Sequence, residues 1–205
     1  MATSLNLIQF LLICGILYAV LTAGTDIIAG LLTRGYRFDT QTANTFGGIG
    51  TPTRRYVLPL NIIAGFLLIA FAIGVWIVTG GNWALRVMAC LLAVSSLLSM
   101  AAIAFFPFHP ADPQGTPENK KNLMLMAPAV ILFVLALVFA AIGNPNWLRY
   151  VSIGILALFV LGAMLSTFIY KLTRRTGAST GIQERTMIYS EMIWIVLQAI
   201  VLLQS

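Results

Sequence analysis

The feature that most constrains this chain is a series of six long runs of apolar residues, almost free of charged side chains. The hydrocarbon core of a bilayer is about 30 Å thick, which requires about 20 apolar residues in a helix. Backbone polar groups in lipid must be bonded internally, so each run is expected to be a helix. The expected spans cover residues 6–31, 57–79, 84–106, 123–142, 148–170 and 186–204.

The composition leads to the same fold class. Hydrophobic residues make up 60% of the chain and charged residues only 9%, whereas soluble domains carry about 25% charged residues. This excludes an ordinary soluble enzyme, a disordered chain and a disulfide-stabilised scaffold. A membrane β-barrel would show short segments of alternating hydrophobicity, and none occur. The connecting segments are too short for a second domain. We therefore predict an all-α bundle of six transmembrane helices, with residues 1–205 forming a single membrane domain.

Two of the expected turns resemble each other. Residues 81–86 read Gly-Asn-Trp-Ala-Leu-Arg and residues 146–149 read Asn-Trp-Leu-Arg. Each turn follows an Ile-Gly pair, and each hairpin has an early proline, Pro59 or Pro128. Helices 2–3 and 4–5 could thus be a duplicated hairpin. The other interpretation is that any turn at a bilayer surface collects Trp and Arg. The sequence leaves both interpretations open.

The basic residues indicate an orientation. Of the 12 Lys and Arg residues, all except Arg86 and Arg149 fall in the first, third and fifth connections or at their borders. Cytoplasmic loops carry the excess of Lys and Arg, so these three loops are expected in the cytoplasm and both termini outside. The basic face could also contact anionic lipid headgroups or an acidic partner. Nucleic acid is not an expected partner, because no basic domain projects from the membrane.

Several kinds of site are not expected. Cys14 and Cys90 fall within spans and lack CxxC spacing, so they are interpreted as packing residues. His109 is the only histidine, which excludes haem held by paired histidines and zinc sites with two histidines. No phosphate-binding GxxxxGK[ST] motif or GxSxG motif occurs. The sequence predicts no cofactor, no metal and no catalytic residue.

Polar residues inside the spans are the candidates for function, because such groups are costly in a membrane. Tyr18, Thr22 and Asp26 are four residues apart and share one helical face. Glu184, Glu191 and Gln198 are seven apart and form a second polar face. Because consecutive spans run in opposite directions, the ends of both polar faces are expected on the side of the long loops. Together they form a candidate ligand-binding pocket. Its predicted members are Tyr18, Thr22, Asp26, Arg37, His109, Asp112, Glu184, Arg185 and Glu191.

A structural interpretation of the same residues also stays open. Asp26 or Glu191 could form an ion pair with an arginine such as Arg37 or Arg185, tying the loops to the bundle. His109 lies in a proline-rich segment and close to Asp112. It could shuttle protons, or it could be a solvated residue at the interface.

Short motifs along almost the whole chain resemble a known family. They are Cys14-Gly15 with Tyr18, Arg34-Gly35-Tyr36, Phe106-Pro107 with Asp112, and Gly181-Ile-Gln-Glu-Arg185 followed by Trp194. The chain resembles the bacterial six-span membrane proteins catalogued as domain of unknown function number 998. It departs from their pattern at Arg34, where Pro is common, and at 120–122, where a His is frequent. The resemblance implies the fold and a place in the inner membrane, and it implies no reaction.

Three functions are compatible with these observations. The first, which we favour, is a non-enzymatic protein that binds lipid or a small ligand, or an accessory subunit of a larger membrane complex or homo-oligomer. The second is an enzyme on lipid or quinone-like substrates, with Asp26, Glu184 or Glu191 as acid or base and Arg37 and Arg185 holding an anion. The third is a small transporter acting as an oligomer.

Overall fold

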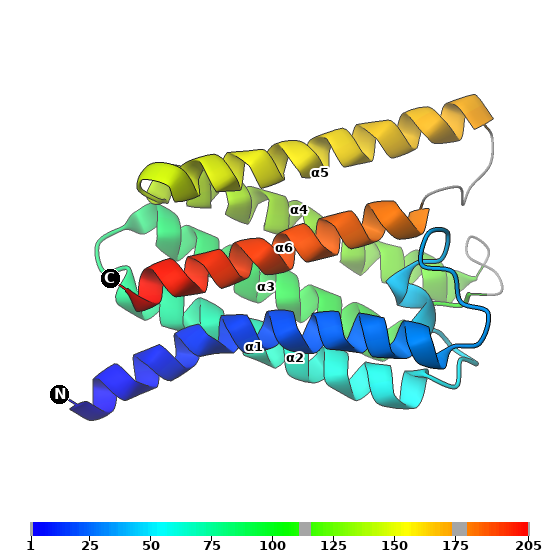
Figure 1. Ribbon diagram of the computed structural model, residues 1–205, viewed down its shortest axis with the longest axis horizontal. Coiled ribbons are helices and arrows are strands. Elements are labelled where there is room, and N and C mark those ends of the chain that lie inside the picture. Colours follow the sequence, from blue (N-terminus) through cyan, green and yellow to red (C-terminus); the bar gives the residue numbers. More distant parts are fainter. Residues whose placement is uncertain (1, 111–115, 174–179, 205) are drawn as a thin grey trace.

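The computed structural model describes residues 2–110, 116–173 and 180–204, and in these ranges every long element is a helix. Figure 1 shows the six α-helices side by side, with a short 3-10 helix in the first connection. Their bounds are α1 Ala2–Leu32, η1 Ala43–Gly47, α2 Arg54–Val78, α3 Trp83–Phe105, α4 Pro117–Gly143, α5 Asn146–Thr173 and α6 Thr180–Leu203.

In the part of the chain that the structure describes, five helices are long and apolar enough to cross a membrane. They contain the stretches Asn6–Leu32, Arg54–Val78, Trp83–Phe105, Pro117–Gly143 and Gly181–Leu203. α5 holds a shorter apolar stretch, Trp147–Gly162, within the side chains that the structure describes. The predicted all-α membrane bundle is therefore confirmed. A sixth crossing by α5, and the interpretation of the two hairpins as a duplication, stay predictions.

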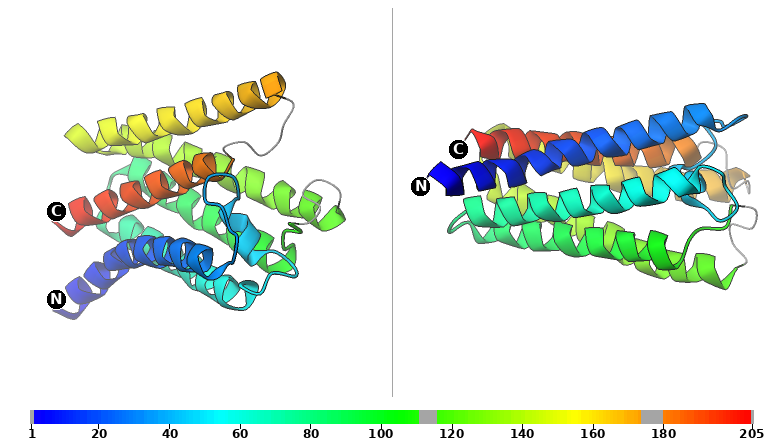
Figure 2. Two further views of the ribbon diagram at one scale, coloured as in Figure 1. Left: turned by 45° about the vertical axis from the view of Figure 1, so that its right-hand side comes forward. Right: turned by 90° about the horizontal axis from the view of Figure 1, so that it is seen from below.

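The helices run up and down, and each packs against its neighbours in the chain, while α6 returns to α1. Both termini lie at one end of the bundle, and the α1–α2 connection, the end of α3 and the start of α4 lie at the other (Figures 1 and 2). We call this second end the loop end. The closing contact between α1 and α6 brings the two polar faces of the sequence together.

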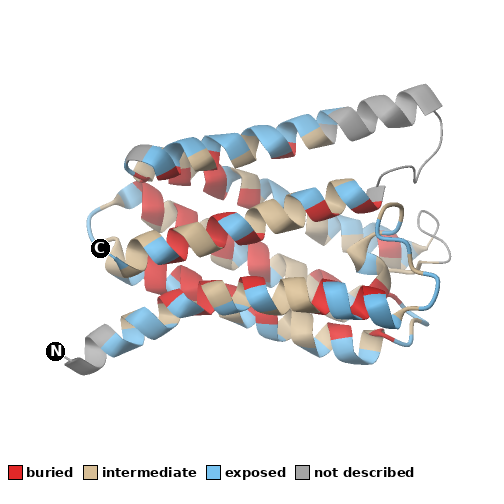
Figure 3. Ribbon diagram, viewed as in Figure 1, coloured by how far each residue is buried: buried red, intermediate tan, exposed pale blue. Residues whose placement is uncertain are grey.

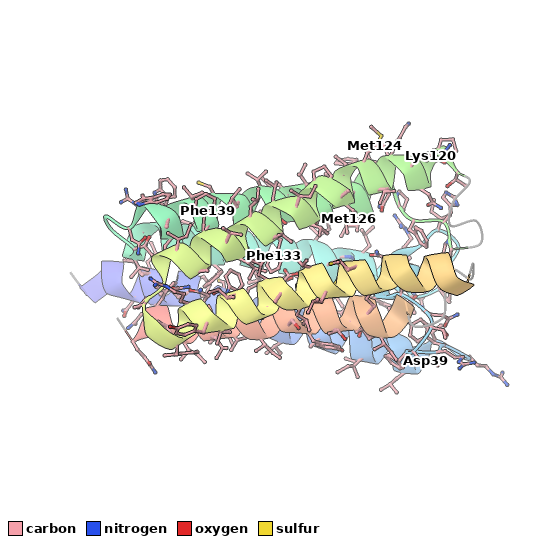
Figure 4. The ribbon with its side chains drawn as sticks, turned by 90° about the horizontal axis from the view of Figure 1, so that it is seen from above. Asp39, Lys120, Met124, Met126, Phe133 and Phe139 are labelled. Carbon is pink, nitrogen blue, oxygen red and sulfur yellow. The ribbon has the colours of Figure 1, made fainter. Side chains whose placement is uncertain are left out.

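Buried residues face the middle of the bundle and apolar residues also cover its outside, as a hydrocarbon solvent requires (Figure 3). In the core, Phe133 of α4 lies 5.3 Å from Phe159 of α5 and 5.7 Å from Trp194 of α6, between ring centroids (Figure 4). On the outside, Phe66 and Leu161 are more than half exposed. Such a surface is stable only in lipid or against another protein.

Small polar side chains join the helices where they approach closely. Ser95 of α3 donates to the carbonyl of Ala129 at 2.8 Å, and Ser96 donates to that of Gly65 at 3.0 Å. Asn82 donates to the Gly143 carbonyl at 2.9 Å and so joins the two similar turns. Serine and glycine at helix contacts are typical of membrane bundles.

The last helix begins six residues before the expected membrane span 186–204. α6 begins at Thr180, so Glu184 and Arg185 lie in its first turns and not in the preceding loop. Their polarity ended the apolar run in the sequence. Both side chains nevertheless have partners in the first connection, which allows them to lie inside the bundle.

Candidate functional site

The first connection folds over the loop end of α1 and α6, and aromatic rings give it a fixed shape. Tyr36 packs against Phe46 of η1, with 4.3 Å between ring centroids, and edge-on against Phe38 at 5.2 Å. Its hydroxyl lies 2.8 Å from the Gln41 carbonyl, to which it can donate. Burial raises the pKa of the Tyr36 phenol, although the Arg185 guanidinium opposes that rise. The phenol therefore keeps its proton at neutral pH.

Arg185 organises this connection from α6. Its Nη1 donates to the carbonyl oxygens of Phe38 at 2.8 Å and Gln41 at 2.9 Å. Its Nη2 donates to the Tyr36 hydroxyl at 2.6 Å and to Asp26 at 2.9 Å, and its Nε donates to Asp26 at 2.9 Å. A guanidinium has five N–H groups. All five of them are used, so Arg185 has no donor left for an anionic ligand.

Asp26 of α1 balances the charge of Arg185. Its two carboxylate oxygens accept from Nη2 and Nε of the guanidinium, a bidentate pair, and Oδ2 also accepts from the Tyr189 hydroxyl at 2.9 Å. The side chains of Arg185 and Asp26 are only 10% and 8% exposed. A buried ion pair is stable when its remaining hydrogen-bonding groups are satisfied, as they are here.

Glu184 ties η1 to α6 next to this pair. Its Oε2 accepts from the backbone N–H of Ala43, the first residue of η1, at 2.7 Å. Gly181 lets the connection approach α6 closely, because a Cβ atom there would lie 2.5 Å from the Phe38 carbonyl oxygen and 2.7 Å from that of Gln41. These are the carbonyls that Arg185 bonds, so the glycine permits the arginine contacts.

An open groove of about 560 Å³ runs along the outside of α6 beside this cluster. Apolar side chains and hydroxyl groups share its lining. It is lined by Phe38, Asp39, Ile182, Arg185, Thr186, Tyr189, Ser190 and Ile193. Asp39 lies at the loop end (Figure 4), where a hydrogen bond from exposed Arg37 lowers the pKa of its carboxyl. The carboxyl is therefore charged at neutral pH.

A second contact between α1 and α6 lies deeper in the bundle. The Tyr18 hydroxyl donates to Oε1 of Glu191 at 2.9 Å. Thr22 follows Tyr18 one turn later on α1. Further along α6, the Trp194 indole donates to the Ser152 hydroxyl at 3.0 Å. Gln198 is fully buried, and neither its Oε1 nor its Nε2 has a hydrogen-bond partner among the described residues.

The structure brings some predicted site residues together and separates others. Asp26, Glu184 and Arg185 form the loop-end cluster, and Tyr18 and Glu191 form the deeper contact. Arg37 does not join either group, because it points out to Asp39 with 70% of its side chain exposed. His109 lies apart, with its backbone N–H and carbonyl bonded to the side chain of Asn119. Asp112 lies outside the described residues.

Sequence reasoning did not select Tyr36 and Tyr189 as partners of the ion pair. Tyr189 carried a signal, since it follows Arg185 by four residues and so shares its helical face. Tyr36 lay in a loop, where no periodicity shows which way a side chain points. In the described ranges, no three His, Cys, Asp or Glu residues lie close enough together to hold a metal ion.

A second groove, of about 570 Å³, lies at the amino end of α2 and has a basic lining. Arg54 donates to the Gly47 carbonyl, and the guanidinium of Arg55 lies 4.5 Å from the centre of the Tyr56 ring. The groove is lined by Thr51, Pro52, Arg54, Arg55, Leu58 and Pro59. The two grooves differ in charge, because the arginine in the first one is already neutralised.

Comparison with known proteins agrees with the architecture. No curated protein and no solved structure matches the chain. Residues 12–201 match the family described as "Protein of unknown function (DUF998)", which covers nearly all of the bundle, including both contacts between α1 and α6. This multi-pass membrane protein therefore belongs to the DUF998 family.

Proposed function

We propose that this protein binds a membrane lipid, or a similar amphipathic molecule, in the groove along α6 without transforming it. The observation that carries the proposal is the lining of that groove. Ile182, Ile193 and Phe38 offer apolar surface for an acyl chain, and polar groups lie among them. The groove lies at the start of a helix that is apolar enough to span the membrane, so it is at the depth of lipid headgroups.

The polar groups of the groove favour a particular kind of headgroup. The hydroxyl of Thr186 donates to the Ile182 carbonyl, that of Ser190 donates to the Thr186 carbonyl, and that of Tyr189 donates to Asp26. The groove therefore presents hydroxyl oxygens and the carboxylate of Asp39 as hydrogen-bond acceptors. A headgroup with ammonium or hydroxyl donors is the complementary ligand.

The hydrogen bonds of Arg185 and Glu184 disfavour the enzymatic alternative. An acid–base role for Asp26 with Arg185 holding an anion would need a free guanidinium donor, and all five donors are used. Glu184 is bonded to the backbone of η1. The loop-end cluster, with these hydrogen bonds in place, is suited to shaping one wall of a binding groove.

Native mass spectrometry of the purified protein in mixed lipid tests the proposal. Phosphatidylethanolamine and phosphatidylcholine share a phosphate, but only the first has N–H donors. We expect phosphatidylethanolamine to be retained in preference. An uncharged glycolipid, which supplies hydroxyl donors alone, separates the contribution of the ammonium charge from that of the donors.

Two variants provide the matched comparison. Ile193→Trp places a large side chain in the groove and should abolish lipid retention. Ile200→Trp changes the same helical face one heptad further on, outside the groove, and should retain lipid. Equal retention of both phospholipids, or retention that Ile193→Trp leaves unchanged, would overturn the proposal.

A further inference from the structure

Glu191 is a carboxyl group near the middle of a membrane-spanning helix. It lies ten residues into the stretch Gly181–Leu203, about 15 Å along the helix axis. Exposed Ile182, Ile193 and Ile200 mark the outer face of α6. Glu191 is on the opposite face, because its offset of two residues from Ile193 corresponds to a rotation of about 200°. The carboxyl therefore points into the bundle, where Tyr18 of α1 donates to it.

No described side chain supplies a positive charge to this carboxyl. Arg185 is on the same helix, but Asp26 neutralises it and its donors are all used. On α1 the facing groups are the phenol of Tyr18 and, towards the loop end, Asp26 itself. On α6, Glu184 bonds the backbone of Ala43. Among the described residues, Glu191 has one hydrogen-bond partner, Tyr18.

The described side chains of the helices packed around α6 contribute no cation at this level either. On α2 the arginines Arg54 and Arg55 lie in its first turn, at the loop end. On the described part of α5, Arg149 lies near the opposite end, in the first turns of the helix. Both positions are at the membrane surfaces, and Glu191 is between them. Its charge has to be balanced from outside the set of described side chains.

An ionised carboxyl that is removed from water and lacks a counter-charge costs several kcal/mol, so it is neutralised by a proton or a bound cation. A metal ion such as Ca²⁺ or Mg²⁺ requires about six oxygen ligands. Here the structure supplies one carboxyl group and one phenol. A proton needs no such ligand shell and fits this geometry.

A second polar group lies on the same face two turns further along α6. Gln198 is 0% exposed, and both polar atoms of its amide lack partners among the described residues. Buried amides are almost always hydrogen-bonded, to protein or to ordered water. Polar groups therefore continue from Glu191 toward the end of the bundle that holds both termini. A dry core would have an apolar side chain at the position of Gln198.

We propose that Glu191 is a proton-binding site inside the membrane domain, with the Tyr18 hydroxyl as its hydrogen-bond partner. The carboxyl group gives up its proton to water and becomes a carboxylate that accepts from Tyr18, and it takes the proton back in the reverse step. This site is separate from the lipid groove on the outer face of α6. It gives the bundle a charge that can change inside the membrane.

Infrared difference spectroscopy of the full-length protein in phosphatidylcholine bilayers, recorded between pH steps, tests this directly. Protonated carboxyl groups have their own C=O band. We expect a band whose intensity changes with pH and which Glu191→Gln removes. The glutamine keeps an acceptor for Tyr18, so the fold is expected to persist. Asp39→Asn, at an exposed loop carboxyl, and Glu184→Gln should leave that band in place.

Tyr18→Phe provides a second measurement that does not depend on losing the carboxyl group. Removal of its hydrogen bond should change the proton affinity by about 2- to 10-fold, the fold-change of one net hydrogen bond. A pH-dependent carboxyl band that persists in Glu191→Gln would overturn the proposal. So would a carboxylate signal from Glu191 that stays constant across the whole pH range. Because the ligand measured is the proton, neither result depends on the lipid proposal.

Discussion

The contact between α1 and α6 holds a carboxyl group at two levels, and the two groups have different partners. At the loop end, Asp26 accepts three hydrogen bonds, two of them from Arg185, and the guanidinium uses its other donors on the first connection. At mid-span, Glu191 accepts one hydrogen bond, from Tyr18. The first arrangement is complete without any added group. The second leaves a charge to be balanced, and it is therefore the level where exchange with an outside species is expected.

The largest effect on stability is expected when the carboxyl group at each level is replaced by an amide. Asp26→Asn leaves the buried Arg185 without an anion and should lower the free energy of unfolding by about 3–5 kcal/mol. Glu191→Gln keeps an acceptor for Tyr18 and should lower it by no more than about 1 kcal/mol. Unfolding of the purified variants in mixed detergent measures both. Equal losses would show that the two levels are neutralised in the same way.

A smaller effect is expected when the loop end is disturbed without a change in charge. In Gly181→Ala the new Cβ atom meets the carbonyls of Phe38 and Gln41, which the backbone cannot easily move, so we expect a loss of about 1–3 kcal/mol. Gly154→Ala is the control, since nothing lies within 4 Å of its Cβ position, and helix propensity favours alanine by up to about 1 kcal/mol. The infrared band of Glu191 should be unchanged in both. The same unfolding assay would contradict this if the two glycines responded alike.

Removal of one hydroxyl from the loop-end cluster should cost less again. Tyr189→Phe deletes one of three hydrogen bonds to Asp26 and leaves Arg185 in place, so the expected loss is about 0.5–1.5 kcal/mol. A double-mutant cycle with Asp26→Asn isolates the interaction, because the two losses should not add. A loss as large as that of Asp26→Asn alone would mean that the phenol, and not only Arg185, is required to hold the carboxylate.

The smallest effect is expected from the exposed ion pair of the first connection. The hydrogen bond from Arg37 lowers the pKa of Asp39. Its contribution is therefore present above the normal aspartate pKa of about 3.9 and disappears as the pH falls through the lowered value. Arg37→Gln should return the pKa of Asp39 to the normal range, as measured by NMR titration. The melting temperature at neutral pH should stay the same, because exposed pairs contribute little.

The sequence allowed much of the bundle to be predicted, for a simple physical reason. A bilayer imposes a length and a polarity on each span, so apolar runs report helices directly. The cost of polar groups in lipid also selected Asp26, Glu184, Arg185 and Glu191 in advance. The alternating direction of consecutive spans then predicted that Asp26 and Glu184 lie at the same end of the bundle, and the structure has both at the loop end.

The choice between arginines could not be made from the sequence. Arg37 and Arg185 were equivalent candidates for Asp26, since both are long side chains near the same surface. The first connection decides between them, because its turn points Arg37 toward Asp39 and brings backbone carbonyls to Arg185. Loop backbone of this kind has no hydrophobic periodicity. For the same reason His109, whose backbone is bonded to Asn119, could not be separated from the site.

The sequence separation of 159 between Asp26 and Arg185 also affects how the protein is made. Ribosomes add about 5–20 residues per second, so Asp26 is synthesised roughly 10–30 s before its arginine. During that time the nascent α1 carries an unpaired acid. A chain that ends before α6 keeps that acid unpaired permanently. Truncated products thus differ from complete ones by one carboxyl group in α1 that has no arginine partner.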